Sequence, residues 1–251
     1  MQITFWAIPM KPITIQRLNS INRLFYQTTA DEFDATRGRP WPGWAEILPY
    51  IQREHNGETF SVLDVGCGNG RFGAYLADEL KLEIDYHGID NNPTLLDHAE
   101  KTLRDAPGMA YTLEQRDVVL SPPEIGEFDL VAAFGLLHHI PGNANRQTFV
   151  QQLAQRVRPG GILAFACWRF YDYERFRKRL IDWPEDLANE IEAGDYLLDW
   201  RRGDVAWRYC HHVDDAEHAQ LIRASGLDDI HTYRADGADN QTNQYSLLKN
   251  T

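Results

Sequence analysis

The chain has 251 residues, enough for one domain or one domain with an elaboration, because single hydrophobic cores stop growing at about 250 to 300 residues. Hydrophobic residues make up 43% and charged residues 25%, which excludes a disordered chain, a collagen and a coiled-coil rod. The formal net charge of −12 excludes a protein that coats nucleic acid non-specifically.

The cysteines and the apolar segments indicate in which cellular compartment the protein is expected. Cys67, Cys167 and Cys210 lie far apart and show no paired-ligand spacing, so we expect neither a disulfide framework nor a zinc site. No apolar run approaches the about 20 residues of a membrane span, and the first residues lack the pattern of a secretion signal. We therefore expect a soluble, cytoplasmic protein without a membrane partner.

Two helices are expected at the start of the chain, over residues 15–26 and 42–53, and we take residues 1–58 as an N-terminal helical cap. From residue 59 to 168, apolar runs alternate with amphipathic stretches of helical length, which is typical of βαβ units. The expected strands of this core are residues 60–65, 84–89, 111–115, 128–134 and 162–167. Helices are expected over residues 70–80 and 93–103, and a third one carries Phe149, Leu153 and Val157 and ends at the Arg-Pro-Gly-Gly segment 158–161.

Five strands joined by short right-handed crossovers predict an α/β fold with a doubly wound, Rossmann-like parallel sheet. Residues 169–210 are charged and rich in tryptophan, and we expect an insertion on the substrate side of the sheet. Residues 211–251 offer a helix at 214–225 and alternating runs at 228–233 and 244–248, which would close a seven-stranded sheet. The whole chain, 1–251, is then a single domain.

A glycine-rich loop, Asp64-Val-Gly-Cys-Gly-Asn-Gly70, follows the first strand. Ligands of open α/β sheets bind at the carboxyl ends of the strands, and glycines let the backbone approach a ligand closely. Residues 68–73 also satisfy the dinucleotide pattern G-x-G-x-x-G, so the glycines alone do not distinguish NAD from S-adenosylmethionine.

Acidic residues after the first three strands favour S-adenosylmethionine. Asp64 would repel a pyrophosphate but would hold the cationic amino group of a methionine moiety. Asp90 can accept both ribose hydroxyls, and Asp117 can accept the adenine amino group while Val118 packs on the ring. The predicted cofactor-binding residues are Asp64, Gly66, Cys67, Gly68, Asn69, Gly70, Asp90, Asn91, Asp117, Val118 and Phe134.

The ordered motifs DVGCGNG, GIDNN, QRDV, FDLVAAFGLLHHI and RPGG resemble those of class I S-adenosylmethionine-dependent methyltransferases. The flanking TRGRPWP segment, His138-His139, Trp168 and RYCH at 208–211 resemble the tRNA wobble-uridine methyltransferases of the Trm9 and ALKBH8 type, which esterify 5-carboxymethyluridine. The resemblance implies S-adenosyl-L-methionine as cofactor, S-adenosyl-L-homocysteine as product, tRNA as acceptor and a small zinc-binding activator protein as partner.

A carboxylate acceptor needs no general base, because it is already a nucleophile near neutral pH; it needs placement and cations that hold it. Arginine suits this task because its planar fork matches a carboxylate. We assign catalytic roles to His138, Arg37 and Arg208, and substrate binding to Arg39, Trp41, His139, Trp168, Arg169, Tyr209 and His211. One of the two adjacent histidines is expected to face the core, and His138 is favoured for the substrate. No metal site is expected, since neighbouring His211 and His212 would chelate poorly.

The cations are concentrated in three segments, residues 168–180, 200–208 and 17–53, whose local net charges are +3, +2 and +1. Such a local basic rim would allow tRNA to bind in spite of the acidic total, whereas a small acidic metabolite would need fewer cations. Three alternatives stay open: a small-molecule O- or N-methyltransferase, a nicotinamide-dependent dehydrogenase, and a catalytically silent partner subunit.

Overall fold

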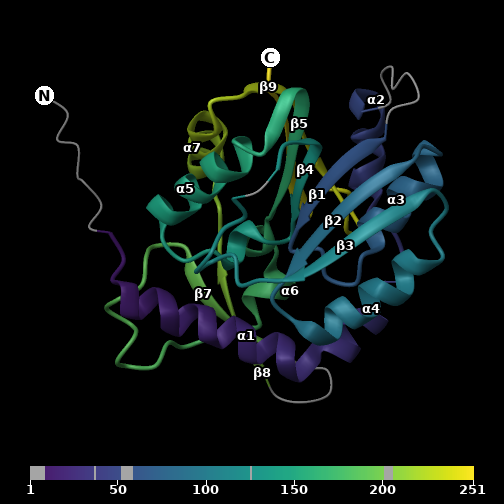
Figure 1. Ribbon diagram of the computed structural model, residues 1–251. Coiled ribbons are helices and arrows are strands. Elements are labelled where there is room, and N and C mark those ends of the chain that lie inside the picture. Colours follow the sequence, from purple (N-terminus) through teal and green to yellow (C-terminus); the bar gives the residue numbers. More distant parts are fainter. Residues whose placement is uncertain (1–8, 37, 52–58, 125, 201–205) are drawn as a thin grey trace, which may run out of the picture.

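The computed structural model describes residues 9–36, 38–51, 59–124, 126–200 and 206–251, and its centre is a seven-stranded sheet (Figure 1). The strand order is β3-β2-β1-β4-β5-β10-β9, and β10 runs antiparallel to both of its neighbours. The strands are β1 (Phe60–Val65), β2 (Ile84–Asp90), β3 (Met109–Gln115), β4 (Phe128–Phe134), β5 (Val157–Trp168), β9 (Asp228–Ala235) and β10 (Asn243–Lys249). The predicted doubly wound, Rossmann-like sheet is confirmed.

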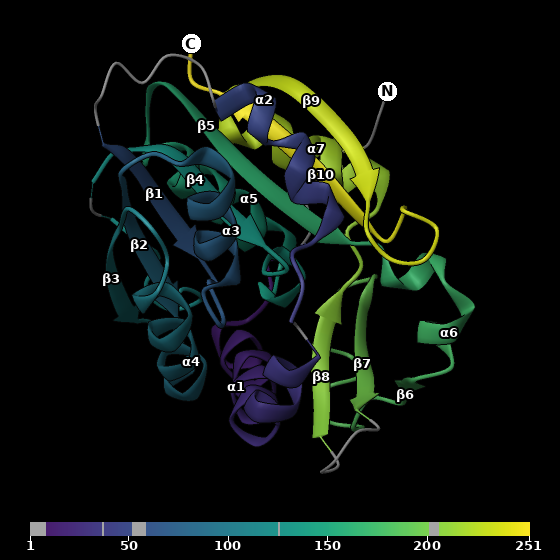
Figure 2. The same cartoon turned by 90° about the vertical axis from the view of Figure 1, so that its right-hand side faces the viewer.

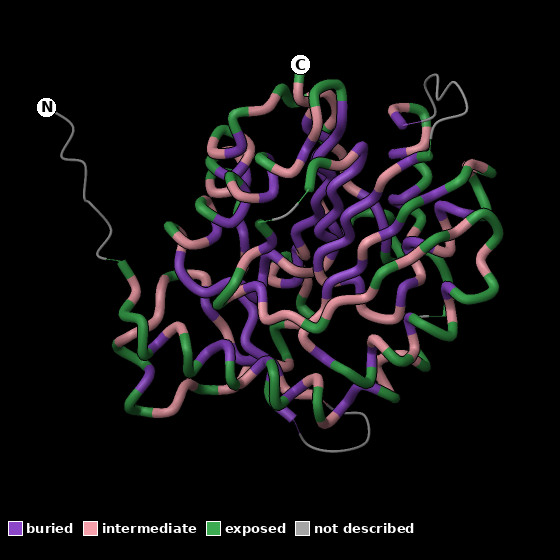
Figure 3. Tube along the Cα trace, viewed as in Figure 1, coloured by how far each residue is buried: buried purple, intermediate pink, exposed green. Residues whose placement is uncertain are grey.

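Helices cover both faces of this sheet. Successive residues of a strand point to opposite faces, and the apolar side chains on each face are buried by a layer of helices. Val62 and Leu130 pack with the layer of α3, α4, η1 and α2, whereas Leu63 and Val131 pack with the layer of α5 and α7. The strands form the buried centre of the tube in Figure 3. The bounds are α3 (Arg71–Leu80), α4 (Pro93–Arg104), α5 (Asn143–Ala154), α7 (Asp215–Ser225), the 3₁₀ helix η1 (Pro42–Glu46) and α2 (Leu48–Ile51).

The first helix, α1 (Pro12–Ala35), is longer than predicted and crosses the bottom of the molecule in Figure 1. It begins at a proline, which suits the first helical position, and it continues because Thr29 and Ala30 are also buried. The predicted helix at 42–53 is wrong in kind, since η1 and α2 replace it and residues 52–58 lie outside the described ranges. Gly43 packs tightly there: a Cβ atom would lie 2.6 Å from the ring of Tyr245.

The segment after β5 contains a second, three-stranded antiparallel sheet, to which the sequence assigns no strands. Its strands are β6 (Leu180–Ile181), β7 (Asp195–Trp200) and β8 (Ala206–His211), preceded by η3 (Phe170–Asp172) and α6 (Glu174–Arg177). Figure 2 shows β8 standing beside α1, and the two elements pack against each other. The small sheet and α1 together cover the carboxyl edge of the large sheet.

The Arg-Pro-Gly-Gly segment does not separate a helix from a strand, as predicted, but lies within β5. Val157 already pairs with Phe128, and the register then shifts so that Ile162 pairs with Leu130. Gly161 allows this irregularity, because a Cβ atom there would lie 2.9 Å from backbone oxygens of β4. Val157 therefore begins the fifth strand instead of ending the helix.

A buried ion network joins α5 and α7 to the small sheet. Arg146 is fully buried, and its guanidinium donates to Glu217 at 2.6 Å and to Glu192 at 3.0 Å. Burial works against ionisation of Glu217, but hydrogen bonding with His211 and the charge of Arg146 outweigh it and lower the pKa of Glu217 to about 2. Both partners are therefore charged at neutral pH.

Replacing Arg146 with alanine should lower the free energy of unfolding by about 3 to 5 kcal/mol, because it leaves buried carboxylates without their cation. Urea denaturation measures this loss. Arg17→Ala is the matched control, since Arg17 pairs with Asp186 at the surface and should contribute less than about 1 kcal/mol. Equal losses in the two variants would contradict the assignment.

Candidate functional site

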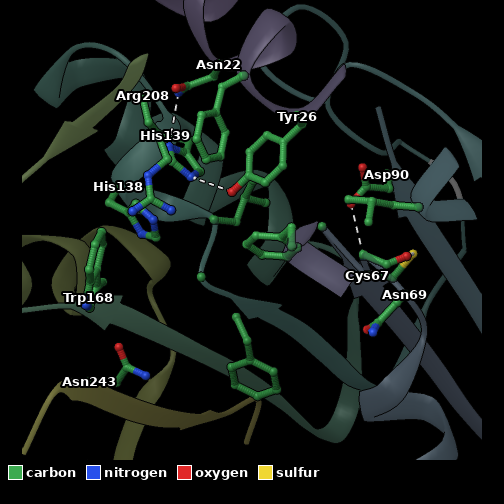
Figure 4. Close-up of a pocket in the computed structure, with 18 of the residues that line it drawn as sticks. Asn22, Tyr26, Cys67, Asn69, Asp90, His138, His139, Trp168, Arg208 and Asn243 are labelled. Atoms are coloured by element: carbon green, nitrogen blue, oxygen red, sulfur yellow. Dashed lines mark hydrogen bonds between the residues drawn. The ribbon is translucent and has the colours of Figure 1, made fainter. Parts of the chain in front are cut away.

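A cavity of about 670 Å³ lies where the carboxyl ends of β1, β2 and β4 meet α1 and the small sheet (Figure 4). Its acidic half is defined by Asp64, Asp90 and Asp117, which follow or end the first three strands of the large sheet. Its basic half is defined by Arg175 of α6, Arg179 of the turn between α6 and β6, and Arg208 of β8. Figure 4 shows Asp90 on one side of the cavity and Arg208 with His138 on the other.

The glycine loop wraps the end of β1 against β2. The amide of Gly66 donates to the carbonyl of Ile89 at 2.7 Å, and the amide of Gly68 donates to the carboxylate of Asp90 at 3.0 Å. Gly68 has φ +55° and faces open space, because a Cβ atom there would meet nothing within 4 Å. Gly70 has φ +73° and faces α4 instead, with Ala99 Cα 3.1 Å from a Cβ position. Gly68 thus lines the cavity, while Gly70 allows α4 to approach the loop.

Adding one methyl group should have different consequences at Gly68 and at Gly70. Gly70→Ala should lower the free energy of unfolding by about 2 to 3 kcal/mol, through left-handed strain and the contact with Ala99. Gly68→Ala should lower it by only about 1 kcal/mol but should weaken binding of S-adenosylhomocysteine, because the methyl group enters the cavity. Denaturation and titration calorimetry measure both effects, and the opposite pattern would refute this division.

Asp64 is the most deeply placed acid of the acidic half. Its side chain is 2% exposed and accepts a 2.6 Å hydrogen bond from the hydroxyl of Tyr86. Burial raises the pKa of Asp64 to about 7, and the neighbouring charge of Asp90 adds to the effect. Burial also raises the pKa of the Cys67 thiol, so this side chain is a neutral packing group. A cationic ligand group beside Asp64 would relieve the cost of its ionisation.

The other two acids are oriented by hydrogen bonds. Backbone amides of Gly68 and Asn92 donate to the two oxygens of Asp90, at 3.0 and 2.9 Å. Asn19 of α1 donates to Asp117 at 2.7 Å, and Val118 beside it lines the cavity. The three acids therefore have fixed positions along the cavity, and the backbone at Gly68 leaves room beside them for a ligand. This arrangement fits an S-adenosylmethionine molecule, with its cationic amino group, ribose and adenine.

Arg208 is the most deeply buried arginine of the basic half. The side chain is 9% exposed, and its guanidinium lies over the rings of Trp168 and Phe25, with Cζ 4.7 and 5.2 Å from their centroids. Within the described part of the chain, no carboxylate forms an ion pair with Arg208, and its Nε atom is buried without a hydrogen bond. A buried cation without a counter-charge is unfavourable, so this group is poised for an anion.

The adjacent histidines occupy different environments. His139 Nδ1 lies 2.9 Å from the carbonyl oxygen of Tyr209 and 3.0 Å from the amide nitrogen of Asn22, and Nε2 lies 3.0 Å from the hydroxyl of Tyr26. Burial and then the charge of Arg208 lower the pKa of His139 to about 3, which keeps the ring neutral. The ring of His138 lies 5.5 Å from that of Trp168, and both histidines line the cavity.

The chain is similar in sequence to known methyltransferases. A family model described as a methyltransferase domain matches residues 63–163. A protein of Encephalitozoon cuniculi described as a methyltransferase is 31% identical over 188 residues, which are 74% of this chain and 77% of that protein. The chain belongs to the class I S-adenosylmethionine-dependent methyltransferases. It is an enzyme, and S-adenosylmethionine is its cofactor.

Other relatives of this methyltransferase are longer. Tocopherol O-methyltransferase of Arabidopsis thaliana is 28% identical over 171 residues, 67% of this chain and 44% of that protein. The tRNA (carboxymethyluridine(34)-5-O)-methyltransferase ALKBH8 of Macaca fascicularis is 27% identical over 143 residues, 57% of this chain and 19% of that protein. The chain thus spans less than half the length of both. A methyltransferase structure from Clostridium acetobutylicum shares the fold, with a TM-score of 0.63 at 14% identity over 89% of this chain and 98% of that one.

Most of the predicted site residues of this methyltransferase line the cavity. All of the predicted cofactor residues except Gly70 line it, and so do His138, Arg208, Trp41, His139 and Trp168. Trp41 packs beside the guanidinium of Arg71, and Trp168 packs among Phe170, Phe176 and Arg208. Arg37, a predicted catalytic residue, lies outside the described residues.

Four predicted substrate residues do not line the cavity. Arg39 is exposed, and its carbonyl accepts from Arg71. Arg169 is buried in bonds to the carbonyl of Val213 and to Asp172, at 2.8 and 3.1 Å. The other two are Tyr209 and His211.

Tyr209 and His211 point away from the cavity because they alternate with Arg208 along β8. Asp195 accepts from the Tyr209 hydroxyl at 2.9 Å and lies 2.7 Å from His211 Nδ1. Burial disfavours the charged ring of His211, but its bonds to Asp195 and Glu217 outweigh this and raise its pKa. Glu217 and Glu192 also accept hydrogen bonds from Arg146, so a cation already occupies this acidic cluster.

Several cavity residues had no sequence signal of their own. Asn19, Asn22 and Phe25 come from α1, and their use depends on how that helix packs over the loop. Arg175 and Arg179 belong to the basic segment 168–180, so the charge count could have singled them out. In the described ranges, no helix has an apolar stretch that could cross a bilayer.

Proposed function

We propose that this methyltransferase esterifies a carboxylate, and that the acceptor is a carboxymethylated wobble uridine of tRNA. The observation that carries the proposal is Arg208, a buried cation in the cavity that has no carboxylate partner among the described residues. A carboxylate acceptor would supply the missing counter-charge in a bidentate geometry.

The two halves of the cavity suit the two reactants. S-adenosylmethionine supplies an electrophilic methyl group together with positive charge, which the acidic half of Asp64, Asp90 and Asp117 favours. The basic half orients the acceptor carboxylate and replaces its hydration shell. Because a carboxylate needs no deprotonation at neutral pH, the low pKa of His139 fits a supporting role instead of that of a general base.

Two observations support tRNA as the acceptor. Relatives named as tRNA methyltransferases match the chain at 23–27% identity. Arg175 and Arg179 line the cavity without an ion pair to any described carboxylate, and they would meet phosphates of a polyanion. A small activator protein as partner is part of this proposal.

A small acidic molecule is the second candidate acceptor. A cavity of about 670 Å³ is in the size range of small-molecule sites, and one relative is named as a tocopherol methyltransferase. Arg208 would still select an acceptor with an anionic group, so both candidates share the carboxylate chemistry.

The experiment gives the protein methyl-labelled S-adenosylmethionine with tRNA that carries carboxymethyluridine, or with a metabolite extract. We expect label in tRNA that mild alkali releases as methanol, because methyl esters hydrolyse under these conditions. tRNA carrying the corresponding amide is the control. Label in the metabolite extract alone would overturn tRNA as acceptor, and label stable to alkali would overturn the carboxylate.

A further inference from the structure

Asn243 is a cavity residue that the predicted site does not include. It is the first residue of β10, it lines the cavity, and it is 7% exposed. In the antiparallel pair of β10 and β5 it lies opposite Trp168, so both side chains leave the sheet on the same face, with Cβ atoms about 5 Å apart. The guanidinium of Arg208 lies 4.7 Å from the ring centroid of Trp168. Figure 4 shows Trp168 between Arg208 and Asn243, so the three side chains line one continuous wall of the cavity.

The side-chain amide of Asn243 is held in one orientation by Asp236. Asn243 Nδ2 donates to Asp236 Oδ2 at 2.7 Å, and the same oxygen accepts from the hydroxyl of Tyr245 at 2.6 Å. The other oxygen of Asp236 accepts from the backbone amide of Gly43 at 2.9 Å. Because a carboxylate among three donors only accepts, a flipped amide would place its own oxygen against Asp236. The nitrogen of this amide is therefore fixed on the side of Asp236.

The other atom of the amide, Asn243 Oδ1, is open to a ligand. Within the described ranges it accepts no hydrogen bond, yet it is not one of the side-chain atoms that are buried without a partner. It is therefore accessible, and the cavity is the open space that Asn243 lines. Figure 4 shows this oxygen turned toward Trp168. A carbonyl oxygen fixed in a cavity wall favours a hydrogen-bond donor and opposes another acceptor.

We propose that Asn243 Oδ1 accepts the imide N–H of a uracil ring whose carboxylate is bound by Arg208, so that Asn243 and Asp236 together select uracil over cytosine. This inference rests on the proposed function, since it assigns the residue that contacts the base of the acceptor. In a carboxymethylated uracil, the carboxylate and the imide N–H belong to separate positions of one flat ring. An anion site and an acceptor atom on either side of Trp168 suit such a molecule. Cytosine has a lone pair in place of the N–H, and the amide fixed by Asp236 has no donor for it.

The affinities of two free bases, measured in the presence of S-adenosylhomocysteine, test the inference without methyl transfer. 5-Carboxymethyluracil should bind about tenfold or more tightly than 5-carboxymethylcytosine, because the cytosine leaves two acceptors facing each other. Titration calorimetry measures both affinities. Equal affinities would overturn the inference and leave the carboxylate acceptor in place.

Two variants test whether the selectivity comes from the fixed amide. Asn243→Leu should bring the two affinities within about twofold of each other by weakening the uracil. Asp236→Asn should also reduce the ratio, but by strengthening the cytosine, because an asparagine at this position can donate to Oδ1 of a flipped Asn243. The φ of 69° at residue 236 suits asparagine as well as aspartate. A merely structural role would weaken both bases equally in both variants, and that result would overturn the inference.

Tyr245→Phe is the matched control. It removes another hydrogen bond to Asp236 but leaves Asn243 with its orienting acceptor, so it should keep the ratio of the original protein. Binding of S-adenosylhomocysteine should stay within about twofold in all three variants, since none of the three residues belongs to the acidic half. Binding of neither base would overturn the inference. If carboxymethylated tRNA is not esterified either, the proposed function falls as well.

Discussion

Replacing Arg208 with glutamine should lower kcat/KM for a carboxylate acceptor by about 100-fold or more, because truncating one partner of a buried charge pair costs about 2 to 5 kcal/mol. The loss should fall mainly on KM. Negative charge on the acceptor oxygen is consumed as the new bond forms, so the ion pair is strongest before the transition state. Steady-state kinetics with varied acceptor concentration separate the two constants.

Arg208→Lys is the informative companion. It keeps the positive charge but loses the planar fork, and it should recover part of the affinity. Binding of S-adenosylhomocysteine should stay within about twofold of the original in both variants, since Arg208 belongs to the basic half of the cavity. An unchanged kcat/KM in Arg208→Gln would show that the acceptor is neutral where it meets this side chain.

Asp64→Asn should have two opposite effects, weaker cofactor binding and a more stable protein without cofactor. The pKa of Asp64 is about 7 in the folded protein, well above that of an unfolded aspartate. Its contribution to stability is therefore present at acidic pH and is lost as the pH rises from about 4 to 7. Above that window the ionised carboxylate destabilises the fold by up to about 4 kcal/mol, which asparagine would avoid while keeping an acceptor for Tyr86.

Urea denaturation at about pH 5 and pH 8 measures the stability effect, which should be smaller at the lower pH and reach its full size at the higher pH. Calorimetry should show cofactor affinity rising with pH through about 7 in the original protein, because only ionised Asp64 attracts the amino group of the cofactor. The variant should bind weakly at every pH. A variant that keeps the rise would show that another group controls it.

The acidic half was predictable from sequence, and the reason is geometric. Asp64 and Asp90 lie in the last residues of β1 and β2, and Asp117 follows β3; the carboxyl ends of parallel strands meet at one edge of the sheet however the helices pack. Gly70, the one predicted cofactor residue that does not line the cavity, adopts the left-handed conformation expected of a loop glycine, but its contact with Ala99 of α4 depends on tertiary packing.

The basic half was only partly predictable, because it depends on a sheet the sequence did not indicate. Arg208, Tyr209 and His211 look equivalent in the RYCH segment, yet alternation along β8 sends only Arg208 to the cavity. Pairings between strands distant from the main fold carry little local signal.

The opposite charges of the two halves also bear on how the reaction ends. Under the proposed function, methyl transfer turns a sulfonium and a carboxylate into a thioether and an ester, so both reacting charges vanish. Arg208 then faces a neutral group, while Asp64 still faces the amino group of the spent cofactor. The ester should consequently dissociate first and inhibit weakly, whereas S-adenosylhomocysteine should remain the stronger product inhibitor. The opposite charges of the two halves thus favour release of the ester before release of S-adenosylhomocysteine in each catalytic cycle.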